Sequence, residues 1–211
     1  MLNIKHNFFP STIQEKLLDL FTGKNFPWYL VPTPDKSHPL VEKFCQNDQN
    51  IQLSHGLTNL IYRKNFKNSD ITIDDKNILD LFVDHTEKNF NIKVKNPMRL
   101  YALLSLPNEN YRQDDYLLPH VDFAHRHKTL LYYINNSDGD TFLFKEKCKR
   151  SLFDDVSKLR EAVSENEFSK KTIDTRITPE QGKAILFNGS TYHSGSIPRQ
   201  HYRYVLNFNF Q

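Results

Sequence analysis

Three histidines and one aspartate lie close together in the stretch YLLPHVDFAHRHKTLLYY, residues 116–133. They are His120, Asp122, His125 and His127. Side chains two positions apart on an extended strand point to the same face, so His120 and Asp122 are expected side by side. An imidazole nitrogen and a carboxylate oxygen are both ligands of transition metals. The pair therefore predicts part of a metal site.

A further histidine, His193, follows the apolar run AILFN and a polar Asn-Gly turn. Two histidines and one carboxylate that cover one face of an iron ion leave the opposite positions open for substrate and oxygen. His193 is thus a candidate for the third ligand of the same ion.

The C-terminal run RYVLNFNF alternates between two kinds of side chain. One face is largely polar and carries Arg203, Val205, Asn207 and Asn209. The other face is aromatic or aliphatic and carries Tyr204, Leu206, Phe208 and Phe210. The apolar face is expected to pack on a core, while the polar face suits a pocket inside a barrel. A guanidinium in that pocket presents a fork that matches a carboxylate.

The elements that must position these residues change in character along the chain. Helices are predicted over residues 10–21, with Ser11 or Thr12 as the cap, and over 74–90. A short strand is predicted within 27–32. Later strands are predicted over 98–106, 128–135, 140–145, 172–179, 182–188 and 201–210. A hairpin turn is expected at Asp138-Gly139.

This order predicts an α+β, mainly β protein. Residues 1–211 are expected to form a single domain, with 1–96 as helical and strand support and 97–211 as the catalytic core. A charged stretch at 145–171 interrupts the strands and is expected to be a solvated face. No signal peptide or membrane-spanning run is visible, so a cytoplasmic location is expected.

Composition places few limits on function. The net charge is only +3, from 28 Lys and Arg against 25 Asp and Glu, which predicts no basic stripe for phosphates. Cys45 and Cys148 are too far apart in sequence for a metal or redox motif and are expected to be reduced thiols.

The order His120-Val121-Asp122, His193 and Arg203, with LLYYINNSDGDTFLF between, resembles the iron(II) and 2-oxoglutarate dependent dioxygenases. The nearest resemblance is to the prolyl-4-hydroxylase-like branch, including small phage-encoded members, and it covers residues 97–211. It implies a double-stranded β-helix, or jelly roll, with helices supporting one sheet. It also implies Fe(II), 2-oxoglutarate and O2, with ascorbate as a reductant.

The resemblance assigns roles to individual residues. His120, Asp122 and His193 correspond to the iron ligands and catalytic centre, and Arg203 to the partner of the distal carboxylate of 2-oxoglutarate. By the same resemblance, Tyr132 and Asn207 contact the cosubstrate, and the tyrosine found before the H-x-D motif has Tyr101 or Tyr116 as its candidates.

The other nearby histidines are not expected to be iron ligands. His201 lies two residues before Arg203 and would leave no room for a five-carbon diacid, so His193 is preferred as the third ligand. His125 and His127 are expected in a solvated loop or behind the ligands.

The reaction that the resemblance implies is hydroxylation of an unactivated C–H bond, in a prolyl or another amino-acid residue. Related halogenases have Ala or Gly where this chain has Asp122, which favours hydroxylation. The alternative is a cupin-like jelly roll that binds metal without 2-oxoglutarate or without catalysis. A nucleic-acid demethylase is disfavoured, because its second arginine is replaced by Asn209. The expected partner is a peptide or small molecule, with no membrane or nucleic acid.

Overall fold

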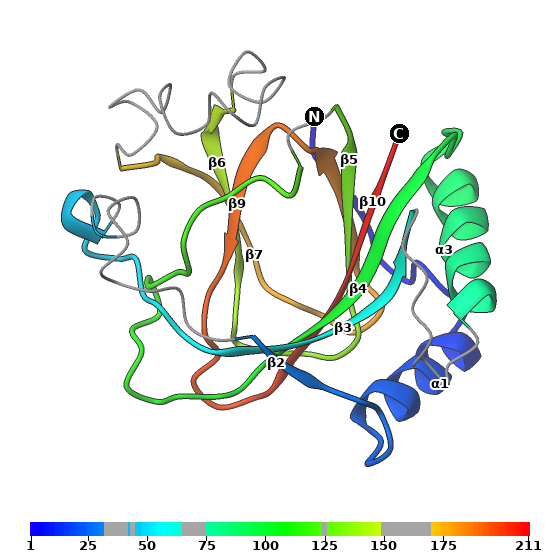
Figure 1. Cartoon of the computed structure of the whole chain (residues 1–211), viewed down its shortest axis with the longest axis horizontal. Coiled ribbons are helices and arrows are strands. Elements are labelled where there is room, and N and C mark those ends of the chain that lie inside the picture. The colour runs from blue at the N-terminus through cyan, green and yellow to red at the C-terminus, as the bar shows by residue number, and fades with distance from the viewer. Residues whose placement is uncertain (32–41, 43–44, 65–74, 124–125, 149–169) are drawn as a thin grey trace.

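The computed structural model describes residues 1–31, 42, 45–64, 75–123, 126–148 and 170–211. Its strands form two antiparallel sheets (Figure 1). The large sheet has the order β1 (Asn3–Lys5), β8 (Ala184–Asn188), β5 (Lys128–Tyr133), β10 (Arg203–Phe210), β4 (Pro97–Ser105), β3 (Gly56–Arg63) and β2 (Tyr29–Val31). The small sheet has the order β7 (Ile173–Ile177), β6 (Thr141–Lys147) and β9 (Thr191–Gly195).

The predicted fold class is confirmed, since the chain is mostly β with a jelly-roll arrangement of strands. The short strand within 27–32 and the six strands predicted after Pro97 all form. Three strands were not predicted: β1, β3 and β9. Two of these lie in the N-terminal part, so residues before Pro97 extend the large sheet on both of its edges.

Two helices cover the outer face of the large sheet, α1 (Ser11–Thr22) and α3 (Asp75–Phe90), as Figure 1 shows. Both were predicted, but the cap of α1 was wrong. Its N-cap is Pro10, whose carbonyl accepts the amides of Ile13 and Gln14 at 2.9 and 3.0 Å. Proline needs no amide partner and fixes its own φ, so it starts the helix without a side-chain cap.

The core between helices and sheet is largely aromatic. Phe9 and Phe82 of the helical side pack edge to face at 5.2 Å, and Phe82 lies 6.1 Å from Phe208 of β10. Phe208 and Phe210 stack at 5.0 Å, and both are fully buried. The apolar face predicted for the last strand is therefore the face that β10 buries under the helices.

A second core fills the space between the two sheets. It contains Leu131, Tyr133, Ile185, Phe187 and Val205 from the large sheet, and Leu143 and Ile177 from the small one. Each central strand of the large sheet thus contributes alternate residues to two cores, as the two-residue period of a strand requires.

The Asp138-Gly139 segment does not form the expected hairpin. The strands before and after it, β5 and β6, belong to different sheets, so the segment crosses between the layers. Asp138 accepts three consecutive amides, of Arg199, Gln200 and His201, at 2.8, 3.1 and 3.0 Å. The turn thereby fixes the chain just before β10 begins.

Neither helix in the described part of the chain combines the length and the hydropathy that a membrane crossing would require.

Candidate functional site

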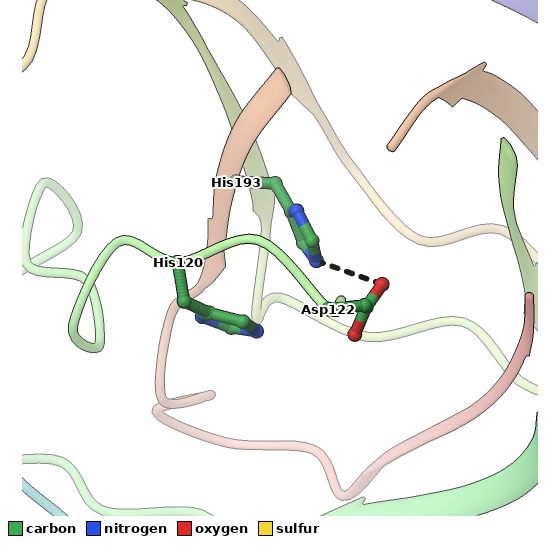
Figure 2. A group of neighbouring side chains, drawn as sticks. All are labelled: His120, Asp122 and His193. Carbon is green, nitrogen blue, oxygen red and sulfur yellow. Dashed lines mark ion pairs between the residues drawn. The ribbon is translucent and has the colours of Figure 1, made fainter. Parts of the chain in front are cut away.

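His120, Asp122 and His193 come together between the two sheets. One ligand atom from each residue lies within 4.8 Å of the others. Figure 2 shows His193 projecting from β9 and the other two side chains from one connecting segment, all three directed toward the same space. The structure therefore places the three residues that the sequence singled out around one point.

Backbone hydrogen bonds join the segment that carries His120 and Asp122 to the strand that carries His193. The amide of His120 donates to the carbonyl of His193 at 3.0 Å, and the reverse bond is 2.9 Å. This antiparallel bridge is isolated, so the continuous strand expected at 120–122 does not form. The bridge nevertheless brings residues distant in sequence side by side, which explains why their imidazoles lie 4.6 Å apart.

Both histidines are oriented by backbone carbonyls. Nδ1 of His120 lies 3.0 Å from the Leu118 carbonyl, and Nδ1 of His193 lies 3.3 Å from that of Thr191. A carbonyl oxygen only accepts, so each Nδ1 carries the proton and each Nε2 keeps a lone pair for a metal. His193 Nε2 also lies 3.6 Å from Asp122 Oδ2.

The carboxylate of Asp122 is buried, with 1% of its side chain exposed. Arg99 Nη2 donates to Oδ1 at 2.8 Å, while Thr129 Oγ1 and Asn209 Nδ2 donate to Oδ2 at 3.0 and 2.9 Å. Asn207 Nδ2 lies 3.2 and 3.3 Å from the two oxygens. Burial of a charge is costly unless it is paired and hydrogen-bonded, and here it is both.

Sequence reasoning missed Arg99 and Thr129. The available signal was a charged residue inside the apolar run MRLYALLSL, where burial without a partner would be costly. The partner could not be identified, because it lies in a different segment of the chain.

The electrostatic setting keeps the site in the form that binds cations. Burial alone would raise the pKa of Asp122, but the imidazoles of His193 and His120, the charge of Arg99 and the bond from Asn209 lower it below its usual range. Burial lowers the pKa of His193 to about 4, against the opposing effect of Asp122. At neutral pH the aspartate is therefore ionised and His193 is neutral.

Arg203 is buried at the start of β10, with 6% of its surface exposed. Its Nη2 donates to Thr141 Oγ1 at 2.8 Å, and among the described residues its Nε has no acceptor. Burial lowers its pKa. Gly139 and Gly195 make room for it, since an added Cβ would come within 2.8 Å of Cδ and 3.3 Å of Nη1, respectively.

His120, His193 and Arg203 all line one cavity of about 380 Å³. Its wall is mostly aliphatic, with a few neutral polar groups. The lining residues include Leu53, Leu57, Leu103, Leu117, Leu118, Leu131, Val205, Tyr101, Ser105, Thr141, Asn207 and Ser194.

The structure places Tyr132 away from this cavity. It lies on the face of β5 that is turned to the helices, and its ring is 4.9 Å from Phe9 and 6.0 Å from Phe82. The next residue, Tyr133, faces the space between the sheets and donates to Thr141 Oγ1 at 2.9 Å. The cosubstrate contact expected for Tyr132 therefore has no geometric support, because a shift of one residue reverses the face of a strand.

Asn207 does line the cavity, but its Nδ2 is already engaged, while its buried Oδ1 has no hydrogen-bond partner among the described residues. Besides Asp122, its Nδ2 donates to the hydroxyl of Tyr101 at 2.9 Å. Both amide hydrogens are thus used to hold neighbouring residues of the site. Of the two tyrosine candidates, Tyr101 lines the cavity, whereas Tyr116 is buried elsewhere and donates to Asp48.

The other candidate histidines do not join the group. His127 is buried, which excludes the solvated loop but agrees with the alternative of a position behind the ligands, and it packs 5.5 Å from Phe123. It is also so close to Gly189 that an added Cβ would come within 2.2 Å of its ring. His201 is exposed. His125 and residues 149–169 of the charged stretch lie outside the described part of the chain.

We predict that Tyr132→Phe leaves the affinity for 2-oxoglutarate unchanged and does not lower the free energy of unfolding. The hydroxyl of Tyr132 is buried and has no hydrogen-bond partner in the part of the chain that the structure describes. Tyr133→Phe is the matched control and should cost about 1 kcal/mol, because it removes the bond to Thr141. Urea unfolding and ligand titration measure both effects. A large loss of 2-oxoglutarate affinity in Tyr132→Phe alone would restore its expected role.

We predict that the metal-free protein loses stability as the pH falls from about 6.5 to 4. A histidine in an unfolded chain has a pKa of about 6.5, whereas burial lowers the pKa of His193 to about 4 in the folded state. In this window the unfolded chain binds a proton that the folded chain does not, so the unfolding free energy falls with pH, by about 3 kcal/mol in total. Urea unfolding across this range should show a shallower slope for His193→Gln. An identical slope would contradict the assignment.

Comparisons with known proteins agree with the chemistry of this site. Residues 108–211 match the model of the family described as the 2OG-Fe(II) oxygenase superfamily, where 2OG denotes 2-oxoglutarate. No curated protein matches the sequence.

Solved structures show similar folds at low sequence identity. An oxidoreductase of the 2OG-Fe(II) oxygenase family from Burkholderia pseudomallei aligns with a TM-score of 0.62 and 11% identity, covering 99% of this chain and 84% of that chain. A prolyl-4-hydroxylase from Pseudomonas putida gives 0.52 and 12%, covering 100% and 92%. A prolyl hydroxylase from Trichoplax adhaerens, in complex with a peptide of hypoxia inducible factor, gives 0.54 and 14%, covering 99% and 82%.

Proposed function

We propose that this chain is a dioxygenase of the 2OG-Fe(II) oxygenase superfamily, whose family model matches residues 108–211, and that it hydroxylates an unactivated C–H bond. The superfamily uses Fe(II), 2-oxoglutarate and O2. The observation that carries the proposal is the presence of His120, His193 and Arg203 in the lining of one cavity, with Asp122 completing the group of ligand atoms.

The donor set fits Fe(II). Two imidazoles with Nε2 available and one ionised carboxylate are the donor set of the non-haem iron enzymes, and they would leave positions for other ligands on a bound ion. We assign His120, Asp122 and His193 as these ligands. The hydrogen bonds that the rings donate from Nδ1 to the carbonyls of Leu118 and Thr191 hold the imidazoles in the required tautomer.

Arg203 fits the distal carboxylate of 2-oxoglutarate. Its Nε is a buried donor that lacks an acceptor within the described residues, and a carboxylate would supply one. Thr141 accepts from both Arg203 and Tyr133, so the hydroxyl hydrogen of Thr141 is available to a second carboxylate oxygen. When bound, Fe(II) and 2-oxoglutarate activate dioxygen so that one oxygen atom enters the substrate and the other enters succinate.

The protein contributes orientation and exclusion of water. The aliphatic wall formed by Leu117, Leu118 and Leu131 lowers the local dielectric, which strengthens the charged contacts of Arg203 and Asp122.

The cavity favours an uncharged, aliphatic substrate group. Of the described residues that line it, Arg203 alone carries a permanent charge, and we assign that charge to the cosubstrate. The rest of the lining offers leucines and a few neutral hydrogen-bonding groups. We therefore propose a prolyl or another aliphatic amino-acid residue as the substrate, in line with the similarity to two prolyl hydroxylase structures.

The proposal is tested by metal binding together with succinate formation. We expect wild-type protein to bind one Fe(II) anaerobically and to form succinate with peptides or amino acids that carry uncharged aliphatic side chains. His120→Ala and His193→Ala should lose both properties, because each removes a ligand. The matched control is His201→Ala, which changes an exposed histidine outside the group of ligand atoms.

Undiminished iron in both ligand variants would contradict the metal assignment. Iron bound without succinate formation from any substrate class would instead favour a metal-binding jelly roll that does not use 2-oxoglutarate.

We predict that Arg203→Ala weakens 2-oxoglutarate binding by about ten- to a few hundred-fold, from the loss of charge-assisted hydrogen bonds. Arg203→Lys should recover part of this loss, because lysine keeps the charge but not the fork. Iron affinity should change little, since no ligand is removed. Anaerobic titration of the iron-loaded protein, followed by metal-to-ligand absorbance, gives the affinities. Equal affinity in wild type and Arg203→Ala would remove the anchor role.

A further inference from the structure

Arg99 is a charged residue of the site to which the proposed function assigns no role. It lies on β4, in register with Asn209 of β10. Its Nη2 donates to Asp122 Oδ1 at 2.8 Å and its Nε to Asn209 Oδ1 at 3.1 Å. The guanidinium carbon lies 4.2 Å from the ring centre of Tyr101 and 4.6 Å from that of Phe123. Two hydrogen bonds and two aromatic faces thus fix the guanidinium against the carboxylate.

The two oxygens of Asp122 have different surroundings. Oδ2 is the oxygen that lies 3.6 Å from His193 Nε2, at the centre of the group of ligand atoms. Arg99 donates to the other oxygen, Oδ1. Its charge is therefore held beside the carboxylate without occupying the oxygen nearest to His193.

Arg99 differs in kind from the other donors to Asp122. Thr129, Asn207 and Asn209 are neutral, and together they already contact both carboxylate oxygens. These neutral donors would remain in contact with the carboxylate if Arg99 were replaced. What Arg99 alone adds is a positive charge, which a guanidinium keeps at every physiological pH.

We propose that Arg99 is a positioning residue that acts on the metal through Asp122, as a fixed countercharge that weakens the binding of cations and favours Fe(II) over Fe(III). This inference rests on the proposed function. A positive charge behind the ligand repels a bound cation, and it repels a trivalent ion more than a divalent one. The same charge adds to the attraction of the site for dianionic 2-oxoglutarate.

Loss of Arg99 should change the metal affinity in the opposite direction from loss of a residue that only orients a ligand. If Arg99 only oriented Asp122, its loss would weaken metal binding. If its charge dominates, its loss strengthens metal binding, because Asp122 keeps its neutral donors and regains its full negative charge. The two roles are therefore separated by the direction of one measurement.

The test compares Arg99→Gln, which removes the charge but keeps an amide donor, with Arg99→Lys, which keeps the charge. Arg63→Gln is the matched control, since Arg63 is the exposed neighbour of Arg99 on β3 and its loss removes the same charge. The readouts are the dissociation constant of Mn(II), the Fe(III)/Fe(II) midpoint potential, and the melting temperature with and without Mn(II).

We expect Arg99→Gln to bind Mn(II) about tenfold more tightly, the scale of a screened charge interaction over a few ångströms. Its midpoint potential should fall by about 30 mV, because a trivalent ion gains about half a decade more than a divalent one and a tenfold change is about 59 mV for one electron. The metal-free variant should melt at a lower temperature than wild type, because a buried carboxylate has lost its countercharge. Bound Mn(II) should restore the melting temperature. Arg99→Lys and Arg63→Gln should match wild type in Mn(II) affinity and potential.

Weaker Mn(II) binding in both Arg99 variants would overturn the proposal in favour of orientation alone. An unchanged affinity and potential in Arg99→Gln would overturn it as well. If Arg99→Gln does not fold, Arg99→Lys decides, since a clear loss of Mn(II) affinity with the charge retained is incompatible with a charge effect. His120→Ala in the same Mn(II) titration distinguishes failure of the proposed metal site from failure of the role proposed for Arg99. Wild-type affinity in that variant refutes the metal site, whereas its loss with an unaffected Arg99→Gln refutes only the role of Arg99.

Discussion

The buried negative charge of Asp122 is the constraint on which the arrangement of the large sheet depends. An ionised carboxylate with almost no exposed surface is tolerated only if positive charge and hydrogen-bond donors surround it. The donors come from three adjacent strands: Arg99 from β4, Thr129 from β5, and Asn207 and Asn209 from β10. The register of these strands therefore determines whether the site is assembled.

β10 links the site to the stability of the protein. Its inner face carries Arg203, Asn207 and Asn209, and its outer face buries Leu206, Phe208 and Phe210 under the helices. A one-residue slip would place the aromatic rings in the cavity and the charged groups in the helical core. The aromatic packing against α1 and α3 thus penalises any register that would misplace the anchor arginine and the donors to Asp122.

The three proposed ligands come from less regular segments. His120 and Asp122 lie on a connection, and His193 lies on β9 of the small sheet. The reciprocal amide-to-carbonyl bonds of His120 and His193 join these segments, and the donors from the large sheet fix Asp122 from the other side. The proposed metal site is consequently a contact between the two layers, where loops held by a rigid scaffold supply the reactive groups.

Local pattern by itself determined much of this protein. The alternation in RYVLNFNF separated the two faces of β10, because side chains of a strand alternate regardless of their partners. The spacing His120-x-Asp122 and the later His193 and Arg203 identified residues that the fold does bring into one region. Both helices could be read from their apolar periodicity.

Only the tertiary structure decided which groups complete the site. The run LLYY offers two adjacent tyrosines, and the choice between them depends on which face of β5 meets the helices. The turn at Asp138 looked like a hairpin, because a local signal cannot show that the following strand joins another sheet. Arg99 looked like an anomaly in an apolar strand, because its partner Asp122 lies 23 residues away, on a connecting segment that only the folded chain brings next to β4. The chemistry that a single residue can perform follows from its residue type. The pairing of charges between distant segments depends on strand register, which only the folded chain fixes.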